Sequence, residues 1–387
     1  MLTPLGLRTS FGFGDRLGLA TPGHIAAVQG TKFFPIFVQQ SVRENLRTRR
    51  TPQQVMDSAK RAVDTAGWDF DWGADADHLK RLEDLPAFVE AGYTFFTIDP
   101  SEHVDNAADH DPITVMEEKT KAFDWSEFEA NYLANKEDPG FGVFTKEKLL
   151  RAVTKYGRAI LHTERMYQRL CQLKEDFDFE VSVDETESPT TPLEHYFIVN
   201  ELTQKGVKFT SLAPRFIGRF EKGVDYIGDL NALEEEMVRH AAVTARFGTY
   251  KLSLHSGSDK FSVYPLIAKY WGDRLHVKTA GTSYLEGLRT ISMTDPDLFT
   301  KIWKLGLENY ETERVSYHVS ADLKKIPVDI GLPALLDDFH AREILHVTFG
   351  SALVQYGAEI KSALEKYADE YTAGLKKHFQ KHLSLLS

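Results

Sequence analysis

The sequence contains a single cysteine, Cys171, among 387 residues. A disulfide within the chain is therefore impossible, and a zinc site built from several thiolates is excluded. One cysteine in a chain of this length is typical of a protein of the reducing cytoplasm, and we expect that location.

Long apolar runs and strongly basic runs are also missing. No 18 consecutive residues are apolar, and the first residues lack a basic region followed by an apolar run, so we expect neither a membrane span nor a signal peptide. The net charge is -11, with 57 acidic and 46 basic residues. The most basic segment holds Arg47, Arg49 and Arg50, which we interpret as solvated surface, and we expect no nucleic-acid partner.

Eight short runs rich in β-branched and aromatic residues recur along the chain, and a helical pattern follows each of them. The runs are residues 32–40, 68–78, 92–103, 178–187, 206–215, 249–260, 274–283 and 314–322. Strands that alternate with helices favour a parallel sheet, and eight such units favour an α/β fold of the closed (β/α)8 TIM type. A ninth run, 343–351, is either an extra strand or the beginning of the last helical region.

Two segments extend this regular alternation. The charged and aromatic stretch 104–177 follows the third run and is predicted to be a helical insertion over the barrel mouth. Residues 352–387 carry apolar side chains at helical spacing, which predicts extra amphipathic helices at the C-terminus. We expect residues 1–387 to form a single barrel domain.

Chemistry in a barrel of this type is located on the loops that follow the strands, so the polar residues that end the runs are the candidate site residues. Helix N-capping would explain a Ser, Thr or Asp at each place, but not His or Lys on several strands. The candidates are Asp77, His78, Asp99, Asp184, Glu185, Thr186, Glu187, Arg215, His255, Ser256, Ser258, Asp259, Lys260, Lys278 and His318.

Two of these run ends indicate a divalent cation. Asp77 and His78 close a run with three aspartates in seven residues, where imidazole can bind a metal and a carboxylate can orient it or transfer a proton. Lys251, Ser253 and His255 alternate with leucines, which places the three polar side chains on the inner face of a strand. The alternatives are an N-capping acidic turn at Asp77 and a hydrogen-bonded core histidine at His255.

The remaining candidates provide acid, base and cationic groups. Asp184, Glu185 and Glu187 are close enough to act as acid, base or ligand, unless they form only a solvated turn. A carboxylated or phosphorylated substrate requires at least one cation, and the candidates, each also a possible salt-bridge partner, are Arg215, Arg219, Lys260 and Lys278.

Other motifs are assigned differently. We interpret His276 and His346 as core residues and His318 as an alternative metal ligand. The glycines Gly12, Gly14 and Gly18 are spaced like those of a dinucleotide-binding loop, but no strand is predicted before them, so we discount that function.

Five longer motifs resemble the tagaturonate epimerase family. They are GADADHLK (73–80), SVDETESPTTPLEHY (182–196), RFEKGVDYIGD (219–229), LHSGSDKFSVYP (254–265) and HVKTAGTSYLEGLR (276–289). The resemblance begins at residue 11 and covers nearly the whole chain. It implies an enzyme that interconverts tagaturonate and fructuronate with a divalent metal.

The order of these motifs also resembles that of class II metal-dependent aldolases. That resemblance implies His78 and His255 as metal ligands, Asp77 as a proton-transfer residue and Glu185 as its counterpart. Lys222 replaces the third aldolase histidine and cannot bind a metal while protonated, so we favour Asp225 as third ligand, with Glu221 or His318 as alternatives. The predicted substrate-binding residues are Asp184, Arg215, Ser256, Asp259, Lys260 and Lys278.

The two uronates differ at the carbon β to the ketone, whose C–H bond the carbonyl does not acidify directly. A retro-aldol step, followed by rotation of the aldehyde fragment and rebonding on its other face, explains the inversion, with Asp77 and Glu185 on opposite faces. A transient hydride transfer is the rival, and it requires a nicotinamide for which we identify no site. The expected cofactor is Zn, Mn, Ni, Co or Fe.

Two other functions compete with the epimerase. An aldolase would release its fragments, whereas a non-catalytic sugar-acid binding protein would show no turnover with any metal. We also expect that neutral ketohexoses are possible substrates and that the chain is a possible homo-oligomer.

Overall fold

The barrel closes through eight parallel strands that pair in chain order, with β1 hydrogen-bonded to β8, as predicted from the alternation of strands and helices. We describe a computed structural model of residues 1–387, in which all residues except 135, 136 and 328 are described. The strands are β1 (Ser10–Phe13), β2 (Phe34–Ser41), β3 (Gly73–Leu79), β4 (Phe95–Ile98), β5 (Asp178–Ser182), β6 (Ser211–Ala213), β7 (Lys251–Leu254) and β8 (Leu275–Thr279).

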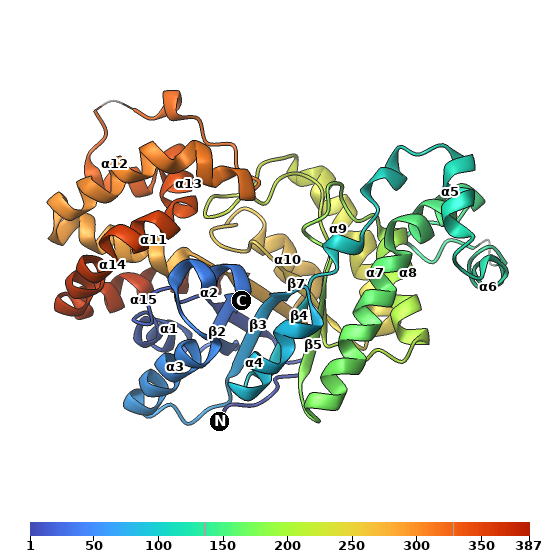
Figure 1. Ribbon diagram of the computed structural model, residues 1–387, viewed down its shortest axis with the longest axis horizontal. Helices are drawn as coiled ribbons and strands as arrows, with labels where there is room; N and C mark the ends of the chain where they lie inside the picture. Colours follow the sequence, from blue (N-terminus) through green and yellow to red (C-terminus); the bar gives the residue numbers. More distant parts are fainter. Residues whose placement is uncertain (135–136, 328) are drawn as a thin grey trace.

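Helices follow each strand and surround the barrel (Figure 1). Those that follow β1 to β7 are α1 (Thr21–Val28), α2 (Val42–Thr48), α3 (Pro52–Ala66), α4 (Leu85–Glu90), α5 (Ile113–Thr120), α6 (Trp125–Tyr132), α7 (Lys146–Leu173), α8 (Pro192–Gln204), α9 (Leu230–Phe247) and α10 (Tyr264–Trp271). Those that follow β8 are α11 (Thr282–Thr294), α12 (Pro296–Glu313), α13 (Phe339–Val347), α14 (Phe349–Lys366) and α15 (Ala368–Leu385).

The predicted number of strands is right, but one member of the set is wrong. Residues 314–322 form a 3-10 helix, η4 (Arg314–Ser316), and a loop, whose Ser320 donates both its backbone N–H and its hydroxyl to the Glu221 carboxylate. The strand that the sequence did not reveal is β1, which has only four residues and obtains its partners from β2 and β8. Pairing on both sides stabilises a strand too short to show a hydrophobic pattern of its own.

Gly12 lies within β1, and Gly14 and Gly18 follow this strand, contrary to the prediction, yet the backbone N–H groups of Gly14 and Gly18 are already bound. The carboxylate of Asp15 accepts hydrogen bonds from Gly18 at 2.7 Å and from Ala20 at 2.9 Å. A dinucleotide-binding loop needs such N–H groups for phosphate oxygens. These glycines are therefore unsuited to a dinucleotide because their N–H groups are bound within the protein, and not because a preceding strand is missing.

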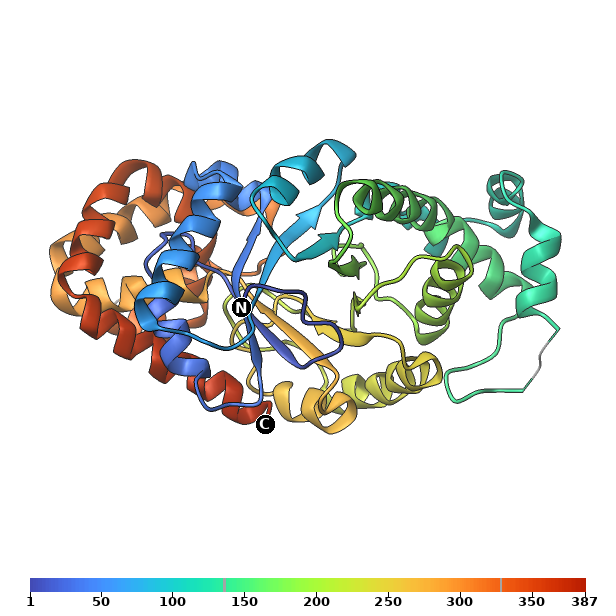
Figure 2. The same cartoon turned by 90° about the horizontal axis from the view of Figure 1, so that it is seen from below.

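The stretch 104–177 follows β4, which is the third of the strands found from the sequence, and forms α5, α6 and α7. In both views α5 and α6 lie at the outer edge of the molecule, beyond α7 and α8, and α11 to α15 lie on the opposite side of the barrel (Figures 1 and 2). The ninth run, 343–351, belongs to α13 and α14, so it is the beginning of the last helical region and not an extra strand.

The last helix, α15, packs closely against α1 and α11. Its buried Phe379 ring lies 5.0 Å from the ring of Phe13 and 6.1 Å from that of Phe11, both on β1. His24 of α1 stacks on Phe13 at 4.7 Å and lies 5.2 Å from Phe379. An aromatic cluster therefore joins the C-terminal helix to the first strand.

We predict that Phe379→Ala lowers the free energy of unfolding by about 3–5 kcal/mol, because a buried aromatic ring is lost and a cavity remains. Chemical denaturation followed by circular dichroism measures the change. Gln380→Ala, an exposed change on the same helix, is the matched control and should alter stability by less than about 0.5 kcal/mol. Equal effects of the two variants would show that the cluster does not anchor α15.

Candidate active site and metal centre

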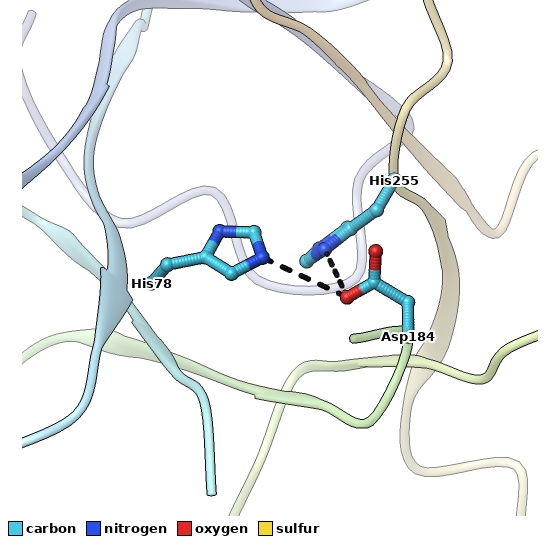
Figure 3. Close-up of side chains that lie close together, drawn as sticks. All are labelled: His78, Asp184 and His255. Atoms are coloured by element: carbon cyan, nitrogen blue, oxygen red, sulfur yellow. Dashed lines mark hydrogen bonds and ion pairs between the residues drawn. The ribbon is translucent and has the colours of Figure 1, made fainter. Parts of the chain in front are cut away.

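Three side chains from three strand ends converge at the carboxyl-terminal end of the barrel (Figure 3). His78 belongs to β3, Asp184 follows β5 and His255 follows β7. Asp184 Oδ1 lies 3.0 Å from His255 Nδ1 and 3.6 Å from His78 Nε2. One ligand atom from each residue lies within 4.8 Å of the other two.

The second nitrogen of each imidazole faces a carboxylate deeper in the barrel. His78 Nδ1 lies 3.0 Å from Asp77 Oδ1, and His255 Nε2 lies 2.6 Å from Glu180 Oε1. In metal sites this second contact fixes the tautomer and the direction of the imidazole ring. Sequence reasoning missed Glu180, which precedes the end of β5 and is fully buried.

Lys278 lies below both pairs and holds their carboxylates. Its Nζ is 2.8 Å from Asp77, 2.9 Å from Glu180 and 2.6 Å from a third buried carboxylate, Asp75. Lys278 was predicted to bind substrate. In the structure its ammonium group faces the barrel interior, where the carboxylates of Asp75, Asp77 and Glu180 bind it.

The electrostatics of the group favour a cation. Burial lowers the pKa of His78, but the carboxylates of Asp77 and Asp184 outweigh it and raise that pKa well above its ordinary value. The pKa of His255 is raised as well, against burial, chiefly by Asp184. The buried Nε2 of His78 has no hydrogen-bond partner within the described part of the chain. Two imidazoles and a carboxylate suit Zn, Mn, Fe, Co or Ni, so these three residues fit the implied metal.

Residues beside the site adopt backbone conformations that side chains rarely adopt. His78 has a φ of 54° and Ser256 a φ of 48°. Left-handed backbone at a non-glycine residue costs roughly 1–3 kcal/mol and is concentrated at functional sites. The left-handed conformation of His78 interrupts the regular alternation of β3, and the His78 side chain lies against Asp184.

The structure does not bring Asp225, the predicted third ligand, into this group. Asp225 is exposed, and its carboxylate accepts a hydrogen bond of 2.9 Å from the Ser262 hydroxyl. The alternative Glu221 binds Ser320, and His318 is exposed at the cavity rim. Asp184, which was predicted to bind substrate, takes the third position because the loop after β5 directs it inward.

Two more predicted substrate-binding residues have structural partners instead. Asp259 is buried in ion pairs with Arg342 at 2.9 Å and with His378 at 2.6 Å. Lys260 is fully buried, and its Nζ donates to the backbone oxygens of Glu221, Val224 and Ser258. The charged groups of Asp259 and Lys260 are therefore bound within the protein, and neither side chain is available to a substrate in the cavity.

A cavity of about 210 Å³ opens beside the three converging residues. Its lining includes Asp184, Glu185 and His255 together with the cationic side chains of Arg215 and Lys222. Arg215 and Ser256 line it, as predicted for substrate-binding residues. Arg43 lines it too and was missed, because it lies in the first turn of α2, after the polar residues Gln39, Gln40 and Ser41 that end β2.

The two predicted proton-transfer residues border a common space. Asp77 and Glu185 both line a small cavity of about 30 Å³ with His78 and Lys222. Burial raises the pKa of Glu185, but the neighbouring His78, more than Lys222, brings the pKa below its usual value. Asp77, held by His78 and Lys278, has its pKa well below the usual range despite burial.

Comparison with known proteins gives close matches over the whole chain. The sequence profile of the tagaturonate epimerase family (UxaE) matches residues 3–386. The tagaturonate/fructuronate epimerase of Thermotoga maritima is 47% identical over 390 residues, which cover 98% of this chain and 81% of that protein.

Solved structures agree with this match. The crystal structure of the fructuronate-tagaturonate epimerase UxaE from Cohnella laeviribosi with one glycerol has a TM-score of 0.95 at 39% identity, covering 100% of this chain and 83% of that one. The native crystal structure of the same enzyme has a TM-score of 0.95 at 40% identity, with the same coverage. Among the described residues, no helix has the length and apolar character needed to cross a membrane.

We predict that His78→Ala, His255→Ala and Asp184→Ala each abolish retention of a divalent metal, because each removes one of three converging ligand atoms. Metal content after desalting, measured by elemental analysis, checks this. Asp225→Ala is the matched control and should retain the metal. Loss of metal in Asp225→Ala but not in Asp184→Ala would restore the ligand set predicted from the sequence.

Proposed function

Because the chain belongs to the tagaturonate epimerase family and is an epimerase, an enzyme of the isomerase class, we propose that it interconverts tagaturonate and fructuronate with a divalent cation held by His78, Asp184 and His255. The observation that carries the proposal is the convergence of these three residues beside a cavity that is also lined by four cationic side chains. A sugar acid needs a group that polarises its ketone and a group that accepts its carboxylate, and this cavity offers both.

The reaction inverts the carbon β to the ketone, and retro-aldol cleavage makes that inversion possible. A base removes the proton of the β-hydroxyl, the Cα–Cβ bond breaks, and its electron pair passes to the ketone as an enediolate while the β-carbon becomes an aldehyde. Rotation of the aldehyde acid and re-formation of the bond on its other face give the epimer. A divalent cation bound by the three residues would supply Lewis-acid polarisation of the ketone.

Glu185 is the base that the cavity favours. Its carboxylate lines the cavity, lies 3.9 Å from His78 Nε2 and is loosely paired with Arg43 at 3.6 Å and with Lys80 at 3.7 Å. We assign proton transfer on the opposite face to Asp77, which shares the small cavity with Glu185. Because Asp77 also contacts His78 and Lys278, it orients the His78 ring as well.

Other properties of the proposed enzyme stay predictions from the sequence. They are the choice of metal among Zn, Mn, Ni, Co and Fe, activity on neutral ketohexoses, a cytoplasmic location and homo-oligomeric assembly. We also propose substrate contacts from Asp184, Arg215 and Ser256, which all line the cavity.

The activity should depend on metal. We predict that purified protein converts tagaturonate to fructuronate, that chelation reduces kcat/KM by more than a hundredfold, and that adding back a divalent metal restores it. Chromatography of the two uronates measures turnover. Full activity in protein shown by elemental analysis to be metal-free would contradict the proposal, and accumulation of free aldehyde acid would indicate an aldolase.

The bond-cleavage route makes a separate prediction. Isotope-labelled aldehyde acid added during turnover should enter the product, because the aldehyde exists free in the cavity between cleavage and rebonding. Glu185→Gln should lower kcat by about 10²–10⁴-fold, as expected for loss of a general base, whereas the exposed neighbour change Glu187→Gln should leave it within threefold. A primary kinetic isotope effect from deuterium at the β-carbon, without aldehyde exchange, would favour hydride transfer, because only that route breaks the β C–H bond.

A further inference from the structure

Four cationic side chains line the cavity beside the proposed metal ligands, and they differ in whether they are paired. Arg43 lies 3.6 Å from the Glu185 carboxylate and Arg219 lies 3.3 Å from the Glu221 carboxylate. Arg215 and Lys222 make no ion pair within 4.0 Å among the residues that the structure describes. An unpaired cation in a partly enclosed site is costly unless a ligand supplies the counter-charge.

Lys222 is directed into the cavity by a hydroxyl group rather than by a carboxylate. Its Nζ donates a 2.8 Å hydrogen bond to the Ser256 hydroxyl. Ser256 directly follows the proposed ligand His255 in the chain, so the hydrogen bond holds the ammonium group of Lys222 next to the proposed metal site. A hydroxyl positions an ammonium group without neutralising it, which leaves the charge of Lys222 available for an anion.

Buried contacts fix the loop that carries Lys222. Lys260 Nζ donates to the Glu221 carbonyl at 2.7 Å and also to that of Val224, the residues that flank Lys222 and Gly223. Arg342 of α13 donates to the Gly223 carbonyl at 2.6 Å and to the Asp259 carboxylate at 2.9 Å. These bonds join the Lys222 loop to the loop after β7, so Lys222 is preorganised by residues that do not line the cavity.

Arg215 approaches the same cavity from the end of β6. Its backbone N–H donates to the Thr190 hydroxyl at 3.1 Å, and its carbonyl accepts from the Thr190 N–H at 2.8 Å. The two bonds hold the Arg215 backbone against the loop before α8, while its half-buried side chain lines the cavity beside Asp184. The backbone of Arg215 is thus held in place, while its guanidinium group has no ion pair within 4.0 Å among the described residues.

We propose that Lys222 and Arg215 bind the carboxylate of the substrate and select sugar acids over neutral sugars. This inference rests on the proposed function, since the divalent metal held by His78, Asp184 and His255 would bind the ketone end of the same substrate molecule. The cavity lining combines Asp184 and His255 of the proposed metal site with two cations, Lys222 and Arg215, that have no ion pair within the described part of the chain. Arginine and lysine form charge-assisted hydrogen bonds with carboxylates that are about twice as strong as neutral ones.

The test compares binding of an acid with binding of its neutral counterpart. The probes, added to the metal-loaded enzyme, are D-gluconate and D-glucitol. D-Gluconate carries a carboxylate and no ketone that could react, and in D-glucitol a hydroxymethyl group replaces that carboxylate. Lys222→Met and Arg215→Met should each reduce the preference for gluconate over glucitol by about 10–100-fold, the effect of one lost charge-assisted bond. They should also raise the KM for tagaturonate by a similar factor.

Two controls accompany these variants. Arg219→Met removes a cation of the same cavity that is already paired with Glu221, and it should change the preference by less than threefold. Lys222→Arg keeps the charge and should retain most of the preference for the acid. Metal content and thermal melting of every variant show whether it folds and keeps the site.

The inference is overturned if the two Met variants weaken gluconate and glucitol binding equally, or if Arg219→Met matches them. Failure of the proposed function gives a different result. In that case the wild-type protein does not convert tagaturonate, yet calorimetry with gluconate and glucitol still reports whether Lys222 and Arg215 distinguish the acid. If the wild-type enzyme converts tagaturonate and both Met variants keep its preference for gluconate over glucitol, the proposed carboxylate site is rejected while the proposed function stands.

Discussion

The ammonium group of Lys278 is the centre on which the site depends. It lies inside the barrel against Asp75, Asp77 and Glu180, all buried. A buried charge is stable only with close partners, and removing one partner leaves the others uncompensated at a cost of several kcal/mol. Burial, opposed by Lys278, raises the pKa of Asp75 to about 7, so the group can hold an extra proton near neutral pH.

This buried layer directs the residues above it. Asp77 and Glu180 each bind one imidazole nitrogen, and the other nitrogen of each ring faces Asp184. The carboxylates that orient the rings also favour positive charge between them, whether as protons or as a divalent cation. Metal and protons compete for the same nitrogens, so cation binding releases protons. The same cavity is also lined by Arg43, Arg215, Arg219 and Lys222, so its lining offers groups for both the ketone and the carboxylate of a sugar acid.

The fold could be predicted to the extent that its pattern is local. Seven of the eight strand runs are strands because alternating or continuous apolar residues mark a buried strand wherever it pairs. β1 was missed because its four residues are stabilised by pairing with β2 and β8, which are distant in sequence. Residues 314–322 resemble a strand in composition, but the Glu221 carboxylate binds Ser320 and holds the segment as a loop.

The sequence by itself determined the family, through long motifs that resemble it. The motif order shared with class II aldolases predicted His78 and His255 as metal ligands, whereas strand ends alone left other histidines open. Only the tertiary structure chose Asp184 over Asp225, since both follow strands and only the path of each loop decides which carboxylate reaches the histidines. It also showed that Lys278 binds buried carboxylates whereas Lys222 faces the cavity. Two lysines look alike in a sequence, and their roles differ because their counter-charges come from strands far apart in the chain.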